Sequence, residues 1–99
     1  MVLRRLIRLR HERMDVGFLS AQVSEEDPGR QPFWSLRVES PSSSEEFRDH
    51  LSDGSCMSLS MVTRDGAHLC GEAYVSSVSE GVDSATVVLL AGAGPLKRT

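Results

Sequence analysis

Three histidines, His11, His50 and His68, are the side chains best suited to bind a metal ion or to move a proton near neutral pH. They lie far apart in the chain, on segments that we interpret as three different structural elements. No two of them have the short spacing that metal sites usually show. We therefore predict solvated or hydrogen-bonded surface histidines and no metal site.

Acidic and hydroxyl side chains give no stronger sign of catalysis. Glu45, Glu46 and Asp49 are close enough in sequence for a carboxylate pair. Acids are nevertheless expected in the first turns of a helix, because they interact favourably with the helix dipole. No serine lies in the G-x-S-x-G pattern of a nucleophile elbow. We accordingly predict that the chain is not an enzyme.

The cysteines and the closely spaced glycines also have simple structural interpretations. Cys56 and Cys70 lack a C-x-x-C partner or a lysine nearby in sequence, so we interpret both as small apolar residues. Gly92-x-Gly94 is followed by Pro95, whereas a phosphate-binding loop needs a helix N-terminus after its glycines. The sequence therefore predicts no cofactor.

Composition indicates one small folded domain spanning residues 1–99. Apolar residues make up 39% and charged residues 25%, which is compatible with a folded core. A net charge of -3 gives no general electrostatic footprint for nucleic acid. Two cysteines are too few for the disulfide framework that small secreted domains usually have, so we expect a cytoplasmic location. The longest apolar run, 87–91, is too short to cross a membrane, so no membrane partner is expected.

Alternation of apolar and polar residues predicts strands over most of the chain. Near the amino end, Leu3, Ile7 and Leu9 alternate with arginines, as in a strand with one face to the core. Leu3, Leu6 and Ile7 could equally line a short helix. We favour the strand because the rest of the chain has strand patterns. Between strand patterns, Glu25 to Pro32 is predicted to form a polar loop.

Further strands are predicted over 16–23, 34–38 and 84–91. The second of these is expected to pair with the first. The last is apolar on both sides, which indicates burial on both faces or a place in a subunit interface. A loop over 81–83 precedes it. In the first two runs the inward residues are expected to be Leu19, Ala21, Val23, Trp34, Leu36 and Val38.

A short helix is predicted near 43–51. Ser43-x-x-Glu46 has the spacing of a capping box, in which each side chain accepts a hydrogen bond from the other residue's backbone N–H. Phe47 and Leu51 are four residues apart and are expected to share the inner face. The outward residues are then Asp49 and His50, and Asp53-Gly54 ends the helix.

A β-hairpin is predicted around Asp65-Gly66. A two-residue turn would mix polar and apolar side chains on both faces. A three-residue loop, 64–66, with Gly66 as a bulge residue in the left-handed conformation, places Met61 opposite Leu69 and sorts the two faces. The expected fold is thus mainly β: a small antiparallel β-sandwich or barrel of about six strands with one short helix.

The segments Gly71-Glu72-Ala73-Tyr74-Val75-Ser76-Ser77-Val78-Ser79 and 82–96 resemble the carboxyl end of phage major tail (tail tube) proteins. That resemblance implies a β-sandwich or barrel that assembles into rings through its sheet edges, and a location in a phage-like particle as the alternative to the cytoplasm. We expect a homo-oligomer or other protein subunits as partners, through a contact made by one side of the last strand. The residues concerned are Ala85, Val87 and Leu89, or Val88 and Leu90.

A second resemblance concerns the arginines at the amino end. Arg4-x-x-x-Arg8 is similar to the first half of the PilZ motif, which implies a small β-barrel that binds a cyclic dinucleotide. The second half, [D/N]-x-S-x-x-G, is absent at the expected distance. Arg4, Arg5 and Arg8 are otherwise expected to make a polar contact. The predicted function is a non-enzymatic structural or interaction module, for which the first resemblance implies a self-assembling phage-tail-like component, with the cyclic-dinucleotide regulator as the alternative.

Overall fold

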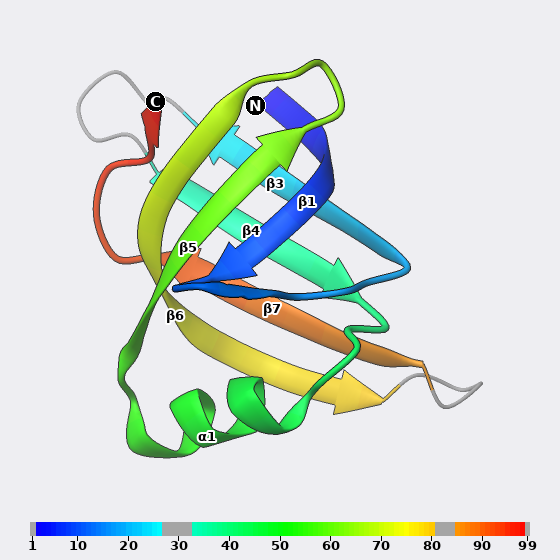
Figure 1. Cartoon of the computed structure of the whole chain (residues 1–99). Helices are drawn as coiled ribbons and strands as arrows, with labels where there is room; N and C mark the ends of the chain where they lie inside the picture. The colour runs from blue at the N-terminus through cyan, green and yellow to red at the C-terminus, as the bar shows by residue number, and fades with distance from the viewer. Residues whose placement is uncertain (1, 27–32, 81–84, 99) are drawn as a thin grey trace.

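The computed structural model describes residues 2–26, 33–80 and 85–98, and they form a closed antiparallel β-barrel of six strands with two extra short strands and one helix (Figure 1). The loop predicted at 81–83 and most of the one predicted at 25–32 lie outside these residues. The elements are β1 (Val2–His11), β2 (Met14–Asp15), β3 (Ser20–Glu26), β4 (Phe33–Glu39), α1 (Glu45–Asp53), β5 (Cys56–Thr63), β6 (His68–Glu80), β7 (Thr86–Gly92) and β8 (Lys97–Arg98).

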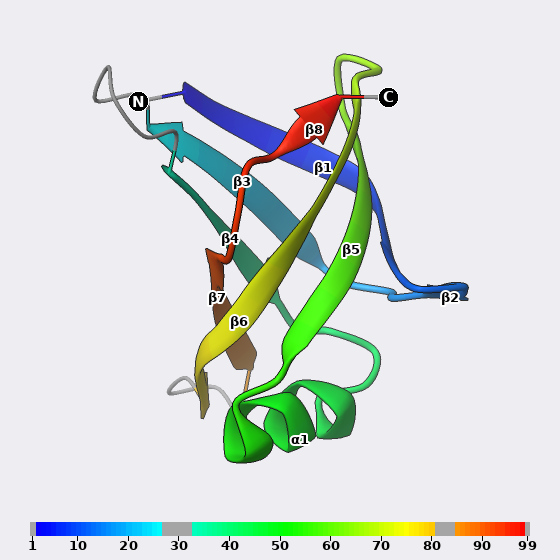
Figure 2. The same cartoon turned by 90° about the vertical axis from the view of Figure 1, so that its left-hand side faces the viewer.

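Closure of the barrel depends on β1. Its first half pairs with β3 and its second half pairs with β5, so the sheet order β1-β3-β4-β7-β6-β5 returns to β1. Pairing on both sides leaves these six strands with few free edges. Helix α1 lies at one end of the barrel, and the start of β1 and the end of β8 lie toward the other (Figure 1). The β1–β2 hairpin projects from the side (Figure 2).

Strand β1 confirms the strand prediction for residues 3–10, and the helical alternative is wrong. The predicted inner face is also partly wrong, because Leu3 and Ile7 are 61% and 63% exposed whereas Leu6 and Leu9 are buried. The cause is a register shift between Leu6 and Arg8 in the pairing with β5. Such a bulge adds a residue and reverses which side chains face inward. Beyond it, His11 faces the core.

The strands that follow obey the predicted alternation more closely. Trp34, Leu36 and Val38 are all buried, and β4 pairs with β3 as predicted. Ala21 and Val23 are buried too, but Leu19 is 78% exposed because β3 begins only at Ser20. The strand predicted over 16–23 therefore begins four residues later than expected, and Leu19 lies outside it.

The hairpin between β5 and β6 has the predicted three-residue loop. Met61 pairs with Leu69, and the backbone N–H of Thr63 donates to the carbonyl of Ala67 over 2.9 Å. Gly66 has φ 93°, the left-handed conformation that a bulge residue requires. The pKa of Asp65 lies below its usual range, chiefly because the Thr63 hydroxyl donates a hydrogen bond to its carboxylate. The positive charge of Arg4 lowers this pKa further.

Trp34 occupies the barrel interior beside two glycines. A Cβ at Gly71 would lie 2.8 Å from the indole Cζ2, and one at Gly92 would overlap the indole Nε1. The same Nε1 donates a hydrogen bond of 2.8 Å to the carbonyl of Gly94. The indole can therefore lie against β6 and β7 only because these positions carry no side chain.

Helix α1 forms close to its predicted place, and Gly54 ends it with φ 74°. The predicted capping box is wrong, since the N-cap is Ser44 and no side chain caps the helix. Phe47 is fully buried as expected, but Leu51 is exposed. The inner face of the helix is thus rotated from the predicted one, toward Glu46.

Candidate metal centre

Three side chains that sequence spacing did not connect meet between α1 and the end of β1: His11, Glu46 and His50. One ligand atom from each lies within 4.8 Å of the other two. His11 is only 6% exposed, and Glu46 and His50 are partly buried. Among the described residues this is the one group of three or more histidine, cysteine or acidic side chains that could hold a metal ion.

Local structure explains how the three converge. Glu46 and His50 are four residues apart in α1, so both project from the same side of the helix. That side packs toward the barrel because Phe47 is buried in the core beside it. His11 reaches the same place because the bulge in β1 turns it inward.

Each of the two histidines in this group has a hydrogen-bond partner. The Nδ1 of His11 contacts the Oε1 of Glu46, and these two atoms share a hydrogen bond. The Nδ1 of His50 lies 2.7 Å from the Ser55 hydroxyl, whose own proton is donated to Asp53 over 2.6 Å. The hydroxyl and the backbone N–H of Ser55 hold the pKa of Asp53 below its usual range. The two imidazole rings meet edge to face, with centroids 5.3 Å apart.

Two imidazoles and one carboxylate form a donor set typical of zinc and related transition-metal ions. A tetrahedral zinc ion with bonds of about 2.0 to 2.2 Å holds its ligand atoms about 3.4 Å apart. Side chains already within 4.8 Å of one another can reach that spacing by small torsional changes. The group can also act without an ion, as a partly buried hydrogen-bonded link between α1 and β1.

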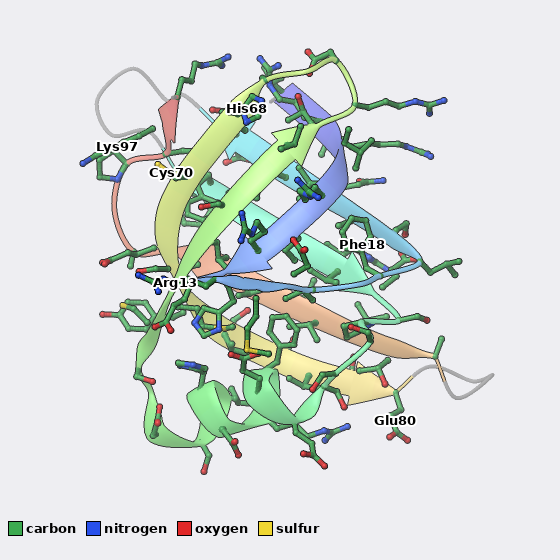
Figure 3. The ribbon with its side chains drawn as sticks, in the orientation of Figure 1. Arg13, Phe18, His68, Cys70, Glu80 and Lys97 are labelled. Carbon is green, nitrogen blue, oxygen red and sulfur yellow. The ribbon has the colours of Figure 1, made fainter. Side chains whose placement is uncertain are left out.

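The prediction that all three histidines are surface groups is therefore wrong for His11 and correct for His68, which is exposed. Figure 3 shows His68 at the end of the barrel away from α1. His50 was expected to face outward, yet it faces His11. The signal that sequence reasoning missed is Glu46-x-x-x-His50, a ligand pair at the spacing of one helical turn.

The residues predicted for a subunit contact divide between the two sides of β7. Val88 and Leu90 are buried inside the barrel, so that alternative is wrong for a folded protomer. Ala85 and Val87 are half-buried, and Leu89 is exposed on the outer face. The strand is apolar on its inner side because it belongs to the core.

The three predicted contact arginines are not gathered into one site. Arg4 makes ion pairs with Glu25 at 3.3 Å and with Asp65 at 3.0 Å. Arg8 lies 3.7 Å from Asp15. Arg5 is exposed. Two of the three arginines therefore already have acidic partners within the chain.

The cysteines are both free and half-buried. Cys56 lies opposite Tyr74, as the hairpin register predicted, and a hydrogen bond with Cys56 raises the pKa of Tyr74. Cys70 does have a lysine neighbour, contrary to the sequence interpretation, because β8 places Lys97 opposite it. The sequence distance between these two residues concealed that pairing.

Comparison with known proteins gives a fold and no activity. No protein-family model matches the chain, and no curated protein matches it. Among solved structures, it is similar to the crystal structure of a hypothetical protein from Staphylococcus aureus, with a TM-score of 0.69 and 14% sequence identity. The match covers 100% of this chain and 73% of that one. At this identity the likeness shows a shared fold alone.

Proposed function

We propose that this barrel is a metal-binding module that holds one divalent transition-metal ion of the zinc class through His11, Glu46 and His50. The observation that carries the proposal is the convergence of two imidazoles and a carboxylate from β1 and α1 within 4.8 Å. The bound ion joins the helix to the barrel wall. Because one ligand comes from β1 and two from α1, metal binding is coupled to docking of the helix.

The donor set supports a transition metal more than magnesium or calcium, since those ions prefer sites made of oxygen ligands. The partly apolar surroundings support it as well. His11 itself is buried, and Phe47, next to Glu46 in the helix, belongs to the hydrophobic core.

Cobalt(II) is the most informative probe, because its visible absorption reports coordination directly. We expect the protein to bind one cobalt(II) ion per chain, and zinc to displace it. His50→Ala and His11→Ala are each expected to weaken binding by at least tenfold through loss of a ligand.

His68→Ala is the matched control, because it removes an exposed imidazole away from the site. It should bind cobalt(II) like the unmodified protein. Absence of a cobalt(II) spectrum at millimolar ion, or equal loss of binding in the His68 variant, would contradict the proposal.

Self-association is a second candidate function, and a separate observation favours it. Leu3, Phe33 and Leu89 line a groove of about 410 Å³ on the outer face of β1, β3, β4 and β7, and all three are exposed. Exposed apolar surface of this kind often marks a contact with another protein. A second copy of this chain, with the same face, is the partner that we propose, because twofold contacts are self-complementary.

Sedimentation at rising concentration tests this contact. The protein should shift from monomer to dimer or larger species, and Leu89→Ser should weaken that shift by about tenfold, since it removes an apolar contact. Ser79→Ala serves as a control, because it removes an exposed hydroxyl from β6 outside this groove. A strictly monomeric protein at high concentration would contradict both self-association and the tail-tube-like assembly. Tail-tube-like assembly and cyclic-dinucleotide binding both stay predictions.

A further inference from the structure

We infer that Ser55 and Asp53 are positioning residues that hold His50 in the orientation and tautomer needed for metal binding. This inference rests on the proposed metal site. It assigns a role to two residues that would not contact the ion themselves and would act through the ligand His50.

The end of α1 creates the arrangement. Gly54, in the left-handed conformation, turns the chain back, and its N–H donates to the carbonyl of His50 over 2.9 Å. The turn brings Ser55 beside the helix that it has just left. There the backbone N–H of Ser55 donates to the Oδ1 of Asp53 over 2.8 Å, and the hydroxyl donates to the same oxygen over 2.6 Å.

Proton counting then fixes the tautomer of His50. A serine hydroxyl has one proton, and Ser55 donates it to the carboxylate of Asp53. The hydroxyl can therefore only accept a hydrogen bond from the Nδ1 of His50, which lies 2.7 Å away. A neutral imidazole with a proton on Nδ1 has its free lone pair on Nε2. Nε2 is thus the atom available to an ion.

Asp53 occupies an electrostatically poor position for helix stability. A carboxylate in the last turn faces the negative end of the helix dipole, where a cation is preferred. Here the carboxylate accepts two hydrogen bonds from Ser55 and in that way polarises the hydroxyl toward His50. Carboxylates behind a metal-binding histidine commonly orient the ring and raise its basicity. The chain Asp53–Ser55–His50 matches that role, with one hydroxyl between.

The decisive variant is Ser55→Ala, which removes the acceptor at Nδ1 and leaves the backbone N–H in place. We expect its cobalt(II) affinity to fall by about 10- to 100-fold, the usual effect of losing such a partner. Nitrogen NMR of the imidazole in the metal-free protein should show His50 shifting from the Nδ1-protonated tautomer toward the Nε2-protonated one. Ser55→Thr keeps the hydroxyl and should restore both affinity and tautomer.

Ser52→Ala is the matched control, because it removes an exposed hydroxyl from the same helix end. It should change neither the cobalt(II) affinity nor the tautomer of His50. Cobalt(II) binding by the unmodified protein, combined with unchanged affinity and unchanged tautomer in Ser55→Ala, would overturn the inference and leave the proposed function intact. Failure of the unmodified protein to bind cobalt(II) would overturn both.

Discussion

Zinc is expected to raise the thermal stability of this protein substantially. At a free zinc concentration 100 times the dissociation constant, linkage predicts about 2.7 kcal/mol of added stability. For a chain of 99 residues this corresponds to an increase in Tm of about 10 to 20 °C. The physical reason is that His11 on β1 and His50 on α1 can share an ion only when the helix is docked on the folded barrel. Differential scanning fluorimetry with and without zinc measures the shift.

Several variants make this test specific. His11→Ala leaves a cavity and should lower Tm even without metal, so the relevant quantity is the increment that zinc produces in each variant. That increment should vanish in His11→Ala and in His50→Ala, and it should persist in His68→Ala. A chelator should reverse it. An equal increment in all variants would show that zinc binds elsewhere.

Loss of the buried indole is expected to be the most damaging single change outside the proposed metal site. Trp34→Ala should lower the free energy of unfolding by about 3 to 5 kcal/mol, a large part of the total of about 5 to 15 kcal/mol for a domain. The side chain is 1% exposed, and its Nε1 secures Gly94 after β7. Both the packing and the hydrogen bond are lost together. Urea denaturation followed by circular dichroism measures the change.

Gly92→Ala tests the same packing from the opposite side. One added methyl group would overlap the indole of Trp34, so either β7 or the ring must move. We expect a cost of about 1 to 3 kcal/mol, as for other overpacked cores. Gly94→Ala is the matched control, since its Cβ would meet nothing within 4 Å. Similar stability of the two variants would contradict this account of how Trp34 fits.

Much of the barrel could be predicted because its rules are local. In β4 the alternation of Trp34, Leu36 and Val38 with polar residues defines an inner face without knowledge of any partner. The β5–β6 hairpin is equally local, because a bulge at Gly66 is what sorts the two faces. Those predictions were confirmed. Sequence did not decide between a sandwich and a barrel, since closure depends on β1 pairing with β5, about fifty residues away.

The candidate metal centre illustrates the opposite case. Sequence by itself placed Glu46 and His50 on one helix, but its pattern pointed Phe47 and Leu51 inward and His50 outward, and only Phe47 of these lies as predicted. The capping box gave Glu46 a local partner, and the structure gives it His11 instead. That choice was made by the burial of Phe47 and by the bulge in β1.

The sequence alone therefore determined most of the six barrel strands, the hairpin register and the end of the helix, because neighbouring residues carry those signals. Only the tertiary structure decided that His11 meets Glu46 and His50. The physical reason is that this contact depends on where α1 docks on the barrel and on the register shift that brings Leu6, Leu9 and His11 to one side of β1, and neighbouring residues in the sequence set neither of these. The three residues on which the proposed function rests are brought together by that packing.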